Sequence, residues 1–65
     1  MNMKEFTRRW NEVTHEGAKL VVFGRNSFIY ADRYYSNAGA SNHVGLVCQG
    51  VFSGVISLSR IKRII

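Results

Sequence analysis

The sequence predicts a small α+β domain that is mainly β, in which an N-terminal amphipathic helix packs on a strongly curved antiparallel sheet of four or five strands. The first sixteen residues place apolar side chains at helical spacing. The rest of the chain is a series of short segments rich in β-branched and aromatic residues, separated by glycine, asparagine and serine. The chain contains no proline, so nothing of that kind interrupts strand pairing.

The length of 65 residues favours a single domain over residues 1–65 with one small core. A chain of this size buries only about 60% of the surface that its unfolded form exposes. Cys48 is the single cysteine, so a disulfide within the chain is excluded, and a reducing compartment is favoured. Because small domains need some support beyond their own core, we expect a homo-oligomer.

The helix is expected over residues 3–16. Asn2 is a good N-cap, and Glu5, three residues later, completes a capping-box pattern. Glu5 can also pair with Arg9 one turn on. Gly17 stands where a left-handed residue would end the helix. The apolar residues fall on one face, which we expect to pack on the sheet: Met3, Phe6, Trp10 and Val13.

The strands are expected at about residues 18–23, 28–35, 43–49, 51–58 and 61–65. Composition predicts turns at 24–27 and at Gln49-Gly50, and a flexible loop at 36–42 that is a candidate for function. Gly45 and Gly54 lie inside strand patterns and are expected to mark bulges or bends. If strand 28–35 is regular, alternation places Phe28, Tyr30, Asp32 and Tyr34 on one face, and Ile29, Ala31, Arg33 and Tyr35 on the other.

The last segment, Leu-Ser-Arg-Ile-Lys-Arg-Ile over residues 58–64, resembles the end of SH3-like and Sm-like small barrels. In those folds a strand runs into a one-turn corner and then into a closing strand. The corner would lie at Ser59-Arg60 and the closing strand at 61–65. The resemblance covers only this last segment, and it implies a fold rather than a function.

The net charge of +5 is unevenly distributed along the chain. In residues 1–17, three basic and three acidic side chains cancel. Asp32 is the only acid in residues 18–65, against six basic residues there: Lys19, Arg25, Arg33, Arg60, Lys62 and Arg63. The strand-forming part therefore carries the whole excess, which attracts polyanions.

Basic and aromatic residues alternate on the predicted strands, a combination that neutralises phosphates and stacks on bases. We therefore expect a non-enzymatic module that binds RNA or DNA through a basic, aromatic-containing sheet face. The candidate binding residues are Arg25, Tyr30, Arg33, Tyr34, Tyr35, Arg60, Lys62 and Arg63.

An alternative is a small inhibitor or adaptor of the kind that phages encode against host defences. Such a protein would bind a host protein or an anionic small molecule and act as a homo-oligomer. Tyrosine and arginine, which are enriched at interface hot spots, are consistent with this alternative. A pull-down from host lysate with and without nuclease separates the two hypotheses: a partner retained after nuclease favours the alternative, and a partner lost favours nucleic-acid binding.

Catalytic residues, metal ligands and cofactors are not expected. Asp32 beside Arg33 suggests an ion pair rather than a general base. His43 and Cys48 lie five residues apart, so a regular strand sends them to opposite faces. The charged N-terminus lacks the apolar region of a signal peptide, and no apolar run reaches membrane-spanning length, so the expected location is cytoplasmic.

Overall fold

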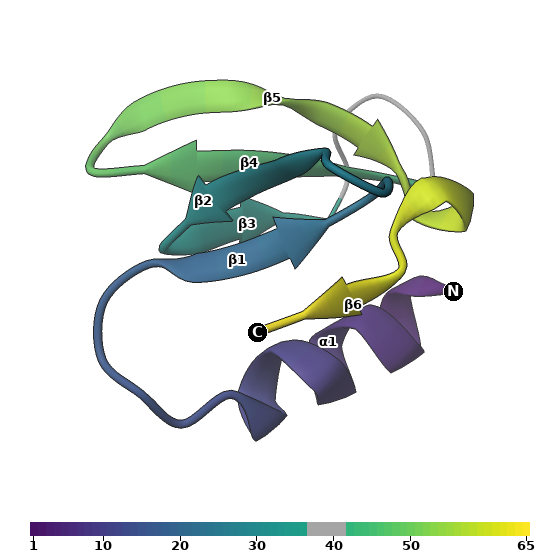
Figure 1. Ribbon diagram of the computed structural model, residues 1–65, viewed down its shortest axis with the longest axis horizontal. Helices are drawn as coiled ribbons and strands as arrows, with labels where there is room; N and C mark the ends of the chain where they lie inside the picture. The colour runs from purple at the N-terminus through teal and green to yellow at the C-terminus, as the bar shows by residue number, and fades with distance from the viewer. Residues whose placement is uncertain (37–41) are drawn as a thin grey trace.

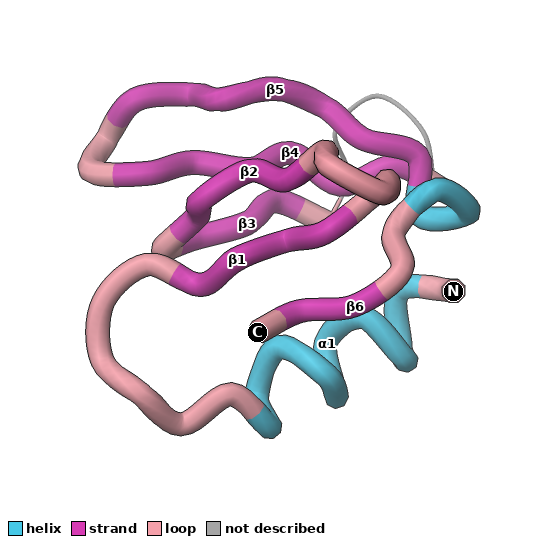
Figure 2. Tube along the Cα trace, viewed as in Figure 1, coloured by secondary structure: helices cyan, strands magenta, loops and turns pink. Residues whose placement is uncertain are grey.

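A computed structural model describes residues 1–36 and 42–65. In these residues the chain forms one α-helix, a short 3-10 helix and six strands (Figures 1 and 2). Their bounds are α1 Met3–Glu12, β1 Lys19–Val22, β2 Phe28–Ala31, β3 Arg33–Tyr35, β4 His43–Cys48, β5 Val51–Ser57, η1 Leu58–Arg60 and β6 Arg63–Ile64. Most of the predicted loop 36–42 lies outside the described residues.

The strands form two three-stranded antiparallel sheets. Sheet A has the order β2-β1-β6, and sheet B has the order β3-β4-β5. The helix lies beside β6, on the side of the molecule away from β5 (Figure 1). The predicted α+β class, mainly β, is therefore confirmed. The described residues form two sheets rather than one, and these sheets do not close into a barrel.

The helix begins as predicted and ends earlier. The side-chain oxygen of Asn2 accepts a hydrogen bond from the Glu5 amide at 2.8 Å, and the Glu5 carboxylate lies 3.0 Å from the Arg9 guanidinium. The helix stops at Glu12, rather than at residue 16, because Val13 takes an extended backbone. Residues 14–16 are exposed, so no packing against the sheets would stabilise a further turn.

The predicted strand 28–35 is divided at Asp32 into β2 and β3. The Asp32 amide donates to the Val47 carbonyl at 2.9 Å, and its carboxylate accepts from the Gln49 amide at 2.8 Å. These bonds join the two sheets and shift the alternation by one residue. The predicted placement of Tyr34 beside Tyr30 is therefore wrong, because Tyr34 packs against the core. The predicted Asp32–Arg33 ion pair does not occur among the ion pairs of the described residues.

The connection of β4 to β5 is a two-residue hairpin at Gln49-Gly50. Cys48 pairs with Val51, and the two turn residues have positive φ values of 52° and 79°. This combination is the type I′ geometry that matches strand twist. The predicted irregularity near Gly54 is also present: Leu46 pairs with Gly54 and Val47 with Phe52, which leaves Ser53 as an extra residue in a bulge.

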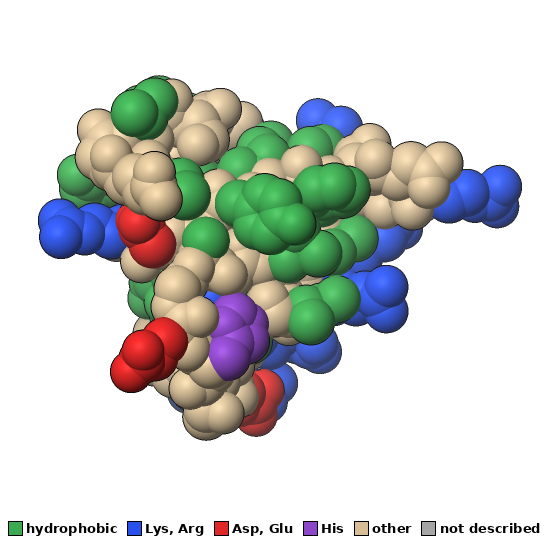
Figure 3. Space-filling view, turned by 60° about the vertical axis from the view of Figure 1, so that its left-hand side comes forward, with side chains coloured by type: hydrophobic (Ala, Val, Ile, Leu, Met, Phe, Trp, Pro, Cys, Tyr) green, Lys and Arg blue, Asp and Glu red, His purple; other side chains and the backbone are tan. Residues whose placement is uncertain are grey.

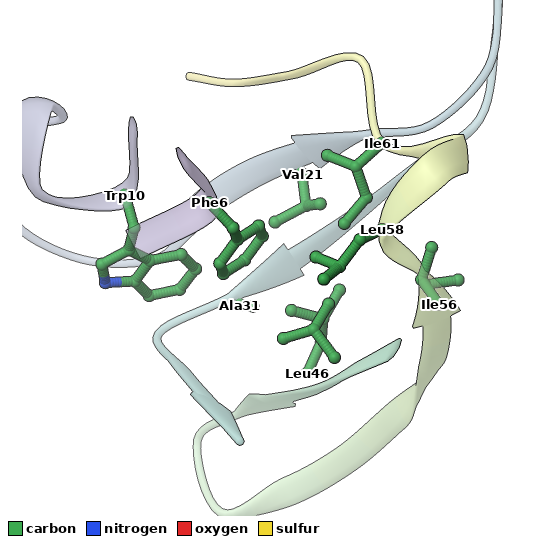
Figure 4. Packing of buried hydrophobic residues seen from close by; sticks show 9 residues of the cluster. Phe6, Trp10, Val21, Ala31, Leu46, Ile56, Leu58 and Ile61 are labelled. Atoms are coloured by element: carbon green, nitrogen blue, oxygen red, sulfur yellow. The ribbon is translucent and has the colours of Figure 1, made fainter. Parts of the chain in front are cut away.

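The core lies between the sheets and the helix (Figure 4). Trp10 is buried, as predicted, and its ring and that of Phe6 contact Tyr34 at centroid distances of 4.9 and 5.0 Å. The Tyr34 hydroxyl donates to the Thr7 side chain at 3.1 Å, which ties β3 to the helix. The buried cluster consists of Phe6, Trp10, Val21, Ala31, Val44, Leu46, Ile56, Leu58 and Ile61.

The closing strand gives a first testable prediction. Ile64 pairs with Val21 and packs against the core, while Ile65 exchanges backbone hydrogen bonds of 2.8 and 2.9 Å with Leu20. Deleting Ile64 and Ile65 removes both bonds and one partly buried side chain, so we expect a loss of about 2–4 kcal/mol in the free energy of unfolding. Urea unfolding followed by circular dichroism measures this loss.

The control is Ile65→Ala, which keeps the backbone pairing and removes only a half-exposed side chain. We expect its unfolding midpoint to stay near that of the original chain. An unchanged midpoint for the deletion would show that β6 adds nothing to the stability of sheet A.

Candidate functional site

Sheet A has an outer face that is apolar and exposed. Val21 points into the core, so its neighbours Leu20 and Val22 point outward. The pairing of β1 with β2 and β6 shows which residues lie beside them on the same face. Tyr30 and Ile65 flank Leu20 in one row, and Phe28 and Arg63 flank Val22 in the next. We call this surface face A, and it consists of Leu20, Val22, Phe28, Tyr30, Arg63 and Ile65.

Two aromatic rings stand on face A. Phe28 and Tyr30 are 51% and 56% exposed, and their rings lie edge to face with centroids 5.8 Å apart. They are two residues apart on β2, so both project from the same side of the sheet. Two half-exposed aromatic rings next to each other on one sheet face form an exposed apolar patch, and they offer a stacking surface to a ligand.

Basic residues surround one end of face A. Arg63 belongs to the face itself, and the Lys62 amide donates to the Val22 carbonyl at 2.8 Å, which places both residues against the end of β1. The Arg60 guanidinium lies 5.5 Å from the centre of the Phe23 ring, next to the β1–β2 turn that carries Arg25. The turn, η1 and the start of β6 meet at this end (Figure 1).

This end of sheet A is electrically one-sided. No acidic residue occurs in β1, β2 or β6, or in the turn at 24–27. The helix differs, because Arg8 and Arg9 lie within 3.0 Å of the carboxylates of Glu12 and Glu5. Four of the six basic residues behind the predicted positive charge therefore lie on face A or at this end of it: Arg25, Arg60, Lys62 and Arg63. Arg33 lies in sheet B, and the Lys19 ammonium lies 4.9 Å from the centre of the Trp10 ring.

Sheet B has a second exposed face on the side away from the core. Tyr35, Phe52 and Val55 are 57%, 56% and 43% exposed. Arg33 and Phe52 flank Val47, which is only 6% exposed although it lies outside the core cluster. We call this surface face B, and it consists of Arg33, Tyr35, Val47, Phe52 and Val55.

Figure 3 shows one side of the molecule, on which hydrophobic side chains gather and Lys and Arg side chains lie around them.

The structure therefore divides the predicted binding residues into three groups. One group lies on face A or at its basic end: Arg25, Tyr30, Arg60, Lys62 and Arg63. Arg33 and Tyr35 lie on face B. Tyr34 is partly buried against the core, where its ring contacts Phe6 and Trp10 and its hydroxyl is bound to Thr7, so it lies on neither exposed face.

Two exposed aromatics were absent from the predicted set. Phe28 joins Tyr30 on face A, and Phe52 belongs to face B. A signal for Phe28 existed in the sequence, because it alternates with Tyr30 on the same strand face. Phenylalanine is usually a core residue, however, and the alternation of residues does not show that no other element covers Phe28 on this face.

The remaining reactive side chains do not converge. His43 and Cys48 occupy alternate sides of β4, and the His43 ring lies 2.8 Å from the side-chain oxygen of its neighbour Asn42. In residues 1–36 and 42–65 no group of three or more histidine, cysteine or acidic side chains is arranged to hold a metal ion. The helix in these residues is too short to cross a membrane.

Comparisons with protein-family models, with curated proteins and with solved structures find no match to this chain.

Proposed function

We propose that the protein binds single-stranded nucleic acid, RNA or DNA, through face A. The observation that carries the proposal is the pair of exposed rings, Phe28 and Tyr30, on a sheet face that also carries Arg63 and has further basic residues at one end. Each stacked base contributes about 1–3 kcal/mol, and basic side chains neutralise the phosphates that connect the bases.

The spacing on face A suits this ligand. Phe28 and Arg63 flank Val22 from β2 and β6, so two strand spacings of about 4.8 Å separate their backbones, or roughly 10 Å. A base on the aromatic side thus leaves its sugar-phosphate backbone near Arg63, Lys62 and Arg60. The rings stand on a sheet and not on a projecting helix, so they meet base faces only where the bases are unpaired.

The chemistry implied is binding without catalysis, and face A offers no nucleophile or general base. Contacts with stacked bases and phosphates distinguish poorly between nucleotide sequences, since every base has a π-face. We therefore propose weak sequence preference together with strong salt dependence.

A matched pair of arginines tests the proposal. We expect Arg63→Ala to weaken binding of a fluorescein-labelled oligonucleotide and to lower the slope of log K against log salt by about 0.7, the value for one single-strand phosphate contact. Fluorescence anisotropy across a salt series measures both quantities. Arg33→Ala, on face B, is the control and should leave the slope unchanged.

Equal effects of the two substitutions would show that binding depends on the net charge of the protein and that face A is not the binding site. Absence of binding at low salt, for single and double strands alike, would overturn the proposal as a whole.

The aliphatic content of face A favours a second candidate, an inhibitor or adaptor that binds a host protein or an anionic small molecule. Leu20, Val22 and Ile65 share the face with the rings and give it the apolar character of a protein-binding surface. Binding that survives nuclease treatment and high salt would support this candidate over the first.

We also propose that the fold is related to the SH3-like and Sm-like small barrels. Three features support this relation: strand β2 continues into β3 through a bend at Asp32, η1 forms the corner before the last strand, and β6 returns to pair with β1. The relation concerns architecture alone, and the nucleic-acid proposal does not depend on it.

A further inference from the structure

Electrostatics separates the two exposed apolar faces. Face A contains Arg63 and lies beside three more basic residues. On face B, Arg33 is the single charged residue, and Asp32 precedes it in the chain with an exposed side chain. Strand β5, the longest strand of sheet B, carries no charge at all. In a chain of net charge +5, face B is therefore the apolar surface that a second copy approaches with least repulsion.

We propose that a second copy of this chain packs face to face on face B. Tyr35, Phe52 and Val55 then become buried in a contact between two sheets, about 10 Å apart, of the kind that forms a β-sandwich. A two-fold contact brings the same surface of both copies together, so each copy contributes the same apolar residues to the contact.

The shape of β5 favours contact through its face over pairing along its edge. The extra residue Ser53 interrupts the ladder with β4, and Gly54 next to it has a φ of 146°. A bulge of this kind bends and twists an edge strand, and proteins use it to prevent edge-to-edge pairing. Phe52 and Val55 lie on either side of the bulge and project from the face.

The small core is a further reason for a second copy. Val47 is buried outside the core cluster, between the half-exposed Phe52 and the exposed Arg33. A partner sheet on face B would turn Val47 into the centre of a second apolar layer. Chains of this length often gain their stability in this way.

The test is the molar mass in solution, measured by light scattering after size-exclusion chromatography of nuclease-treated protein. We expect twice the 7.4 kDa of one chain, at low and at high salt, because apolar contact is not screened. Phe52→Asp should give the mass of a single chain with an unchanged circular dichroism spectrum. Phe28→Asp is the matched control, an equally exposed phenylalanine on face A, and should keep the doubled mass.

Three results would overturn the proposal. The first is a single-chain mass for the original protein at the highest concentration it tolerates. The second is a doubled mass retained by both Phe52→Asp and Val55→Asp, the second variant guarding against a local adjustment at residue 52. The third is a mass greater than two chains, since an isologous contact closes at two copies.

Discussion

Replacing Phe6 by alanine is expected to remove a large part of the protein's free energy of unfolding. Phe6 has no exposed surface, and its ring contacts both Trp10 and Tyr34. Removing a buried phenylalanine costs about 3–5 kcal/mol, which includes the cavity that remains. At roughly 0.05–0.15 kcal/mol per residue, the whole stability of a 65-residue domain is of the same size.

Circular dichroism and urea unfolding measure this effect. Phe6→Leu, which refills part of the space, should give a smaller loss that can be quantified even when Phe6→Ala is unfolded. The matched control is Phe28→Ala, because Phe28 is half exposed and lies outside the core cluster. Equal losses for Phe6→Ala and Phe28→Ala would contradict the assignment of Phe6 to the centre of the fold.

Several features set by neighbouring residues were predicted correctly, although the helix ends at Glu12 and not at the predicted residue 16. The Asn2 cap, the Glu5–Arg9 pair and the buried stripe through Phe6 and Trp10 depend on spacing within a single helix. The Gln49-Gly50 turn and the irregularity at Gly54 likewise follow from the backbone freedom of glycine. Local pattern was sufficient in each case because the interacting groups are close in sequence.

The bend at Asp32 was not predictable in this way. It depends on the carbonyl of Val47 and the amide of Gln49, which are 15 and 17 residues further along the chain. Residues 28–35 contain neither glycine nor proline to signal an interruption. A shift of one residue moves every later side chain of a strand to the opposite face. Tyr34 therefore packs against the core because of the contacts of Asp32 with residues 47 and 49, which the alternation of residues 28–35 does not show.

The candidate site was predictable in composition but not in grouping. The sequence identified a basic, aromatic strand region, and five of the eight candidate residues come together on or beside face A: Arg25, Tyr30, Arg60, Lys62 and Arg63. Their proximity depends on the pairing of β6 with β1, which brings residues 63–64 beside residues 21–22. Arg33 and Tyr35, close neighbours of Tyr30 in sequence, lie on the other sheet because of the bend.

Replacing both rings of face A is expected to weaken the binding of single strands by at least one order of magnitude. At about 1–3 kcal/mol for each stacked base, the double variant Phe28→Ala, Tyr30→Ala loses about 2–6 kcal/mol, which is a decrease in affinity of roughly 30-fold to more than 10,000-fold. Both rings are half exposed, so the fold should tolerate their loss. Anisotropy with a labelled oligonucleotide measures the affinity, and thermal unfolding checks the fold.

The control for this variant is Tyr35→Ala, which removes a tyrosine of nearly the same exposure from face B. The contributions of stacking and of charge to the affinity can then be distinguished by how each variant's affinity changes with salt concentration. The aromatic double variant should lower affinity by the same factor at every salt concentration, because stacking releases no counterions, whereas Arg63→Ala should change the salt slope itself. An aromatic variant that binds as tightly as the original chain would show that face A attracts nucleic acid by charge alone and that its rings have another use.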